Sequence, residues 1–111
     1  MKIDYRFAKT SDLEQLIQLR IKMQLDANSF LEADVTDEYI EKVRNYFNHA
    51  IKSKKYYGAS ALEGNIIVGT AGVCFYEKPP SLYGGTGLVG YVTNVYTLPS
   101  HRRKGIGTHL M

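Results

Sequence analysis

Val95-Tyr-Thr-Leu-Pro-Ser-His-Arg-Arg-Lys-Gly-Ile-Gly-Thr-His-Leu-Met111 joins an apolar run to a Pro-containing turn, a group of cations and the first turn of a predicted helix. Backbone amides at a helix start, placed beside fixed positive charge, bind phosphate or pyrophosphate groups. Gly105 and Gly107 keep these amides accessible, because a side chain at either position would hold an anion away from the backbone. The pattern therefore predicts an anion-binding strand-turn-helix unit.

The spacing Arg102-Arg-Lys-Gly-Ile-Gly107 resembles the acetyl-CoA motif of the GNAT superfamily of N-acetyltransferases, which is Arg/Gln-x-x-Gly-x-Gly/Ala. Its context, after an apolar strand and a turn, strengthens the match. The resemblance implies acetyl-CoA as the cofactor, with its pyrophosphate held by the cations and amides of the loop. The residues implied in this role are Arg102, Arg103, Lys104, Gly105, Ile106, Gly107 and Thr108.

The resemblance also implies a role for the strand before this loop. In GNAT proteins the backbone of this strand pairs with the pantetheine arm of the cofactor, as an added strand would. The positions that match here are Val95, Tyr96 and Thr97. One amide of this strand, with Val95 N–H as the candidate, would polarise the thioester carbonyl.

The rest of the chain predicts the element order β-α-α-β-β-β-α in a single domain over residues 1–111. This order matches the N-terminal part of the GNAT fold, an α/β (α+β) domain with a mixed, mainly antiparallel sheet flanked by helices. Because GNAT proteins usually continue through a fifth strand, another helix and two more strands, the resemblance implies a C-terminally truncated domain. The predicted elements are a strand at 3–7, helices at 13–26 and 36–55, a hairpin at 57–76 and a strand at 88–98.

Local signals refine these elements. Ser11 and Glu14 have the spacing of a capping box for the first helix, and Thr36 begins the second. The near-continuous apolar run at 88–98 predicts a strand buried on both faces. Cys74, within another apolar strand, is expected to be a buried and inert thiol. A lone cysteine and the absence of a signal peptide favour the cytoplasm.

The reaction implied by the resemblance is direct attack of a primary amine, on a small molecule or a protein, at the thioester of acetyl-CoA. The amine must lose a proton, so a general base or a water chain is needed. Histone-acetylating relatives carry a Glu at about the position of Tyr91, where this chain has no carboxylate. Tyr91 and Asn94 are the catalytic candidates, and Thr93 is a further polar group that can position water or the acceptor. The general acid of the family is commonly a Tyr on the later helix, so no residue is assigned to it.

The acceptor side is expected to involve the loop at 27–35, which combines apolar Phe30 and Leu31 with acidic Glu32 and Asp34. Glu77 is a further acidic candidate. This mixture suits an amine that carries some apolar bulk. Many relatives are homodimers, and the resemblance leaves the oligomeric state of this chain open, with a homodimer as one alternative.

Two other functions remain open. A non-catalytic CoA- or anion-binding or regulatory module would explain the missing acid and base. Nucleic-acid binding is the weaker alternative, because no aromatic side chains are interleaved with the cations and the net charge is only +3.

No metal site is expected, because the histidines lack metal-ligand spacing, and no apolar run is long enough for a membrane span. The histidines are His49, His101 and His109.

Overall fold

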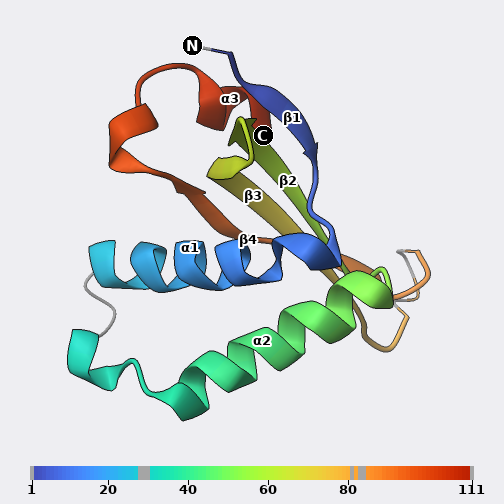
Figure 1. Ribbon diagram of the computed structural model, residues 1–111. Helices are drawn as coiled ribbons and strands as arrows, with labels where there is room; N and C mark the ends of the chain where they lie inside the picture. The colour runs from blue at the N-terminus through green and yellow to red at the C-terminus, as the bar shows by residue number, and fades with distance from the viewer. Residues whose placement is uncertain (1, 28–30, 81, 83–84, 111) are drawn as a thin grey trace.

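The computed structural model, which describes residues 2–27, 31–80, 82 and 85–110, contains a four-stranded sheet in the order β1-β2-β3-β4 (Figure 1). Every neighbouring pair of these strands is antiparallel. The predicted hairpin is confirmed as β2 and β3, joined by a turn in which Gly64 has a positive φ of 64°. The strands are β1 (Asp4–Phe7), β2 (Tyr56–Glu63), β3 (Ile66–Glu77) and β4 (Leu88–Thr97).

Two long helices cover one face of this sheet (Figure 1). The second begins as predicted, because Thr36 Oγ1 accepts a hydrogen bond of 3.1 Å from Tyr39 N–H. Three short 3-10 turns and a last short helix complete the described elements, so the predicted order is confirmed. These elements are η1 (Thr10–Asp12), α1 (Leu13–Asp26), η2 (Glu32–Asp34), α2 (Asp37–Lys52), η3 (Pro99–His101) and α3 (Ile106–Leu110).

The two faces of the sheet bury different side chains, as the alternation of a strand requires. Leu62 and Ile67 pack in the main core with α1 and α2. Their chain neighbours Ala61 and Val68 point to the other face, where they meet Ile106 of α3 in a second cluster. Anchored in this way, α3 and the loop before it are held against the sheet.

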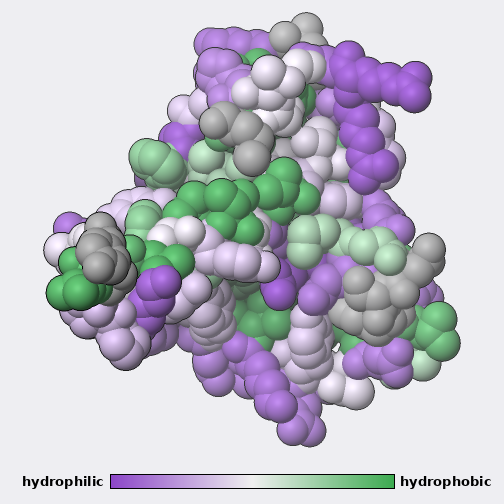
Figure 2. Space-filling view, turned by 180° about the vertical axis from the view of Figure 1, so that it is seen from behind, coloured by the Kyte–Doolittle hydropathy of each residue, from purple (hydrophilic) through white to green (hydrophobic). Residues whose placement is uncertain are grey.

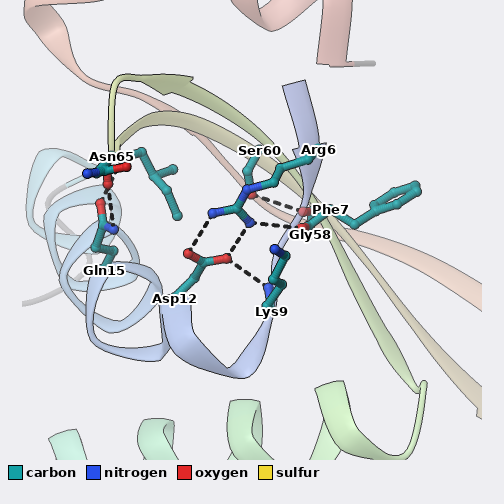
Figure 3. Close-up of polar contacts among 9 residues, drawn as sticks. Arg6, Phe7, Lys9, Asp12, Gln15, Gly58, Ser60 and Asn65 are labelled. Carbon is teal, nitrogen blue, oxygen red and sulfur yellow. Dashed lines mark hydrogen bonds and ion pairs between the residues drawn. The ribbon is translucent and has the colours of Figure 1, made fainter. Parts of the chain in front are cut away.

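An ion pair joins β1 to the beginning of α1 (Figure 3). Arg6 donates to both carboxylate oxygens of Asp12, at 2.6 and 3.0 Å, and Asp12 also accepts from Lys9 N–H at 2.8 Å. The Arg6 guanidinium is the main cause that lowers the pKa of Asp12. The predicted capping box of Ser11 and Glu14 is wrong, because η1 precedes the helix and Asp12 occupies the N-cap position.

A side chain of α1 also holds the β2–β3 hairpin in place (Figure 3). Gln15 Nε2 donates to the Asn65 carbonyl at 3.1 Å, and Gln15 Oε1 accepts from Ile67 N–H at 2.7 Å. The same amide group therefore satisfies two backbone groups at the turn, and it fixes the hairpin relative to the helix.

The prediction that residues 88–98 are buried on both faces is wrong. β4 lies at the edge of the described sheet, next to β3 only, so its outer backbone edge has no neighbour among these strands. Hydrophobic side chains gather across the middle of the molecule in the view from behind (Figure 2). The large apolar side chains of β4 that are exposed are Leu88, Tyr91, Val92 and Val95.

Candidate active site

A β-bulge interrupts the pairing of β4 with β3. Thr70 pairs with Tyr96 and Gly72 with Thr93, so two residues of β4 lie opposite one of β3. The first of the two, Asn94, has a positive φ of 55°. Asn tolerates this left-handed conformation better than most residues, and a bulge turns the strand and changes which groups face its neighbour.

Beyond the bulge, the backbone of β4 alternates between its partner strand and its open edge. Leu98 N–H donates to the Val68 carbonyl across the sheet at 2.8 Å. By the alternation of antiparallel pairing, the backbone of Tyr96 also faces β3, whereas that of Val95 and Thr97 faces outward. Val95 N–H is therefore at the open edge, as its predicted role requires, and Tyr96 contributes its side chain instead.

The Tyr96 side chain belongs to a polar cluster at the end of α1. Its hydroxyl donates to Asp26 Oδ2 at 2.6 Å, and Arg102 Nη2 lies 3.2 Å from the same oxygen. Both interactions lower the pKa of Asp26, the Tyr96 hydrogen bond more than the contact with Arg102. The cluster therefore ties β4 and the basic loop to the C-terminal end of α1.

Arg102 is engaged on three sides in this cluster. Besides the contact with Asp26, its Nε donates to the Thr97 carbonyl at 2.9 Å, and its guanidinium carbon lies 5.3 Å from the centroid of the Tyr96 ring. Arg102 therefore stabilises the position of the loop through these contacts. This role differs from the one that the sequence motif implied, in which Arg102 is a free cation that binds the pyrophosphate. Sequence reasoning missed Asp26, because no local pattern links it to a loop 76 residues away.

The remaining residues of the basic loop lie open to solvent. Arg103 and Gly105 have positive φ values of 64° and 76°, which make a tight turn between the 3-10 turn and α3. Ile106 is buried, whereas Arg103, Lys104 and Thr108 are exposed. Apart from its chain neighbours and the backbone of its own helix, a Cβ atom on Gly107 would meet no protein atom within 4 Å, so the space beside this glycine is open. A phosphate-bearing ligand fits this open, cationic turn.

On the other side of the bulge, a cavity of about 340 Å³ lies between the two long helices and the sheet. Arg20 of α1 lies at this cavity, and the sequence motifs did not point to it. The described residues that line the cavity are Arg20, Tyr39, Lys42, Val43, Tyr46, Phe47, Tyr56, Cys74, Tyr91, Thr93 and Asn94.

Asn94 and Tyr56 form the inner wall of the cavity. Asn94 is 3% exposed, and its Nδ2 donates to the Tyr56 hydroxyl at 3.3 Å. Asn94 Oδ1 is buried without a hydrogen-bond partner in the described structure. Burial raises the pKa of Tyr56, opposed by the Asn94 hydrogen bond and by the charge of Arg20, so this hydroxyl is protonated at neutral pH.

The tyrosine needs a glycine beside it. A Cβ atom on Gly72 would lie 2.2 Å from the Tyr56 hydroxyl oxygen, far closer than atoms in contact. Gly72 is thus required by the close approach of a side chain, and it fixes where the Tyr56 hydroxyl meets Asn94.

The structure brings some of the predicted catalytic-side residues together and leaves others apart. Tyr91, Thr93 and Asn94 share the cavity, and Cys74 also lines it. The prediction of a buried thiol is wrong, because Cys74 is half-buried, with Sγ 3.7 Å from the Tyr91 carbonyl oxygen.

The acidic residues proposed for the acceptor side do not reach the cavity. Asp34 accepts from Leu31 N–H at 2.9 Å and closes η2, and Glu32 of the same turn is exposed. Glu77 lies at the far end of β3. Phe30 is outside the described residues. Helix side chains, chiefly of α2, form this wall, and Ala27 and residues 31–35, which are the described part of the predicted loop, do not line it.

Two of the three histidines, His101 and His109, make contacts that link parts of the fold. His101 Nε2 lies 3.4 Å from Glu63 Oε1, and His109 stacks on Tyr5 with ring centroids 3.8 Å apart. No group of three or more His, Cys, Asp or Glu side chains suited to a metal ion occurs within residues 2–27, 31–80, 82 and 85–110. Over the same residues, no helix is both long and apolar enough to cross a membrane.

The family model described as the acetyltransferase (GNAT) family matches residues 19–111, which include the bulged edge strand, the basic loop and all the described residues that line the cavity. The chain belongs to the GNAT family of acetyltransferases. No curated protein matches this GNAT chain significantly in sequence.

Solved GNAT structures share its fold. A predicted acetyltransferase from Clostridium acetobutylicum, solved with acetyl-CoA, is 30% identical with a TM-score of 0.86, over 97% of this chain and 68% of that one. A GCN5-related N-acetyltransferase from Ralstonia eutropha JMP134 is 25% identical with a TM-score of 0.80, over 99% and 71%. Glucosamine-6-phosphate N-acetyltransferase from Arabidopsis thaliana, at 18% identity and a TM-score of 0.65 over 99% and 69%, shares the fold alone. The predicted fold class and family are confirmed.

Proposed function

We propose that this GNAT chain transfers an acetyl group from acetyl-CoA to a primary amine of a small molecule. The observation that carries the proposal is the position of the bulge at Asn94 and Val95. On one side of it lie the open backbone edge and the basic loop, and on the other side lies the cavity. A donor bound along the edge and an acceptor in the cavity would meet at the bulge.

The residues present fit acetyl-CoA. The exposed cations and amides of Arg103 to Thr108 suit its pyrophosphate, with open space beside Gly107. Val95 offers an outward amide and carbonyl at the strand edge, whereas the Thr97 carbonyl already accepts from Arg102. We therefore assign pantetheine pairing mainly to Val95 and the pyrophosphate to the turn that Arg102 braces.

Acetyl-CoA supplies an acetyl group on a thioester: the acceptor nitrogen forms the new C–N bond, the C–S bond breaks, nitrogen loses a proton and sulfur gains one. Val95 N–H, fixed by the bulge, would donate to the carbonyl oxygen as negative charge develops there. A preorganised donor of this kind stabilises the transition state by about 3 kcal/mol. The strand geometry thus supplies electrostatic stabilisation without a charged side chain.

We assign removal of the proton from the attacking amine to water. None of the described residues that line the cavity is an Asp, a Glu or a His, and Tyr56 is protonated at neutral pH. Asn94 is a positioning group for the acceptor or for a water, and Tyr91 lies near it as an exposed wall residue. We therefore expect a rate that rises with pH as the free amine becomes more abundant.

The lack of a carboxylate or histidine in the cavity also favours a second candidate function, a CoA-binding module without turnover. The two are separated by incubating the 111-residue chain with acetyl-CoA and a panel of small primary amines. Mass spectrometry then follows the acetylated amine, and a thiol reagent follows free CoA. Formation of both products above the no-protein control supports transfer. Saturable acetyl-CoA binding with no acetylated amine would contradict it and favour the binding module.

A further inference from the structure

The cavity beside the bulge is positively charged. Two cations, Arg20 and Lys42, lie among its described lining residues, and none of those residues is an Asp or a Glu. A site for a polycationic amine needs carboxylates to offset the positive charge, and like charges at close range disfavour binding. The lining therefore selects against acceptors that carry several ammonium groups.

Arg20 is the cation placed to bind a ligand. It lies one helical turn after Leu16 and Ile17, both fully buried, so it is on the sheet-facing side of α1 and is half-buried there. Its charge acts on the Tyr56 hydroxyl inside the cavity, where it opposes the effect of burial on the pKa.

Arg20 also differs in its surroundings from three of the four other arginines of the described chain, and the fourth, Arg103, is exposed on the basic loop. Arg6, Arg44 and Arg102 each contact at least one carboxylate within 4.0 Å. For Arg20 no carboxylate of the described residues lies within that distance. A guanidinium removed partly from water without an anionic partner loses solvation, and a bound carboxylate would restore it through two parallel hydrogen bonds.

The rest of the cavity suits an apolar body and one amine. Five of its eleven described lining residues are aromatic, and a volume of about 340 Å³ is in the range for a small molecule. Lys42 is exposed, and its Nζ lies 3.9 Å from Glu38 Oε1, so the positive charge of Lys42 is partly offset. At the inner end, Asn94 Oδ1 is a buried acceptor that no described group uses.

We propose that the acceptor is a small amine that carries a carboxylate and an apolar or aromatic side group, as an α-amino acid does. Arg20 binds the carboxylate, the aromatic walls enclose the side group, and the amine lies toward Asn94 and the bulge. This assignment rests on the proposed acetyltransferase function for its biological meaning. A phosphate is less suited, because phosphate sites combine several cations or backbone amides, whereas Arg20 is the single half-buried cation among the described lining residues.

The test compares two ligands that differ only in the carboxylate, L-phenylalanine and phenethylamine. Each is titrated into the 111-residue chain and followed by calorimetry or by amide chemical shifts. Because the carboxylate gains charge-assisted hydrogen bonds, we expect L-phenylalanine to bind about tenfold more tightly or better. In the Arg20→Gln variant this preference should fall to about threefold or less, since Gln keeps the stem but not the charge.

A matched control removes a charge from the same helix but outside the cavity. Lys22 is exposed two residues further along α1 and does not line the cavity, so Lys22→Gln should keep the preference for L-phenylalanine. Equal binding of the two ligands by the unchanged chain, or an Arg20→Gln variant that keeps the full preference, would overturn the proposal. Circular dichroism on each variant shows that it is folded.

Failure of this inference is distinguishable from failure of the proposed function. Acetyl-CoA is titrated into the same samples, and acetyl transfer to both amines is followed. If acetyl-CoA binds and phenethylamine is acetylated at least as well as L-phenylalanine, the substrate class is wrong and the transferase function stands. If L-phenylalanine binds through Arg20 but acetyl-CoA neither binds nor reacts, the transferase function is wrong and the carboxylate site stands.

Discussion

At the scale of single residues, the inner wall of the cavity depends on close contacts between the Tyr56 side chain and the two strands beside it. Tyr56 reaches Asn94 only because position 72 lacks a side chain. Asn94 in turn has the left-handed backbone conformation of the bulge, and its side chain donates a hydrogen bond to the Tyr56 hydroxyl. A glycine and an asparagine on neighbouring strands therefore set the inner wall of the cavity together.

Gly72→Ala tests this arrangement. The added methyl group would lie 2.2 Å from the Tyr56 hydroxyl oxygen, so either the ring or the strand must move. We expect the free energy of unfolding to fall by about 2 kcal/mol, as for overpacked cores. Urea denaturation measures the change.

Gly90→Ala is the matched control, because its Cβ atom would approach no atom closer than 3.3 Å. The control should change the free energy of unfolding by about 0.5 kcal/mol or less. If Gly72→Ala is as stable as the unchanged chain, the account of the Tyr56 position is contradicted.

At the scale of elements, the site depends on contacts that hold α1 to the sheet at both ends. The Arg6–Asp12 pair fixes the N-terminal end of α1 to β1, and the cluster around Asp26 fixes its C-terminal end to β4 and the basic loop. Arg20 lies between these two anchors. The helix is thus held in place on both sides of the residue that we assign to ligand binding.

The pH dependence of stability should report the first anchor. Arg6 holds the pKa of Asp12 below its ordinary value, so the ionised pair stabilises the fold above the unfolded-state pKa, about 3.9. That stability is lost as the pH falls through the lower folded-state pKa. Asp12→Asn should reduce the free energy of unfolding at pH 7 by about 2 kcal/mol and flatten its decline in acid.

The control for this prediction is Asp4→Asn, which changes an exposed carboxylate on the same strand as Arg6. Thermal or urea unfolding between pH 7 and pH 3 provides the comparison. An Asp12→Asn variant that loses stability in acid as steeply as the unchanged chain would show that the pair does not control this region.

At the scale of the whole molecule, the element order and the basic loop could be predicted because their signals are local. Pro99, Gly105 and Gly107 limit backbone conformations within a few residues, and alternation or helical spacing identifies the elements. The burial of β4 could not be predicted in the same way, because the apolar run at 88–98 contains no information about which strand lies beside it. The structure shows both that β4 has a strand neighbour on one side only and that four of its large apolar side chains are exposed.

The same reason explains the site residues that sequence reasoning missed. Asp26 meets Arg102 across 76 residues, and Arg20 faces the cavity only once both helices pack on the sheet. A signal for Arg20 was present, because a cation on the apolar side of an amphipathic helix is unusual and invites a search for its partner. The acidic loop residues were predicted to lie at the acceptor side, but Asp34 closes a turn by accepting a hydrogen bond from Leu31 N–H.

Binding of acetyl-CoA at the strand edge and basic loop is measured by calorimetric titration of the 111-residue chain with acetyl-CoA. We predict saturable binding at one site, weakened about tenfold or more in Gly107→Leu, whose side chain enters open space beside the loop that the pyrophosphate would occupy. Gly64→Asn, at the distant hairpin turn, should bind as the unchanged chain does. A folded chain that does not bind acetyl-CoA, or a Gly107→Leu variant with unchanged affinity, would contradict the account.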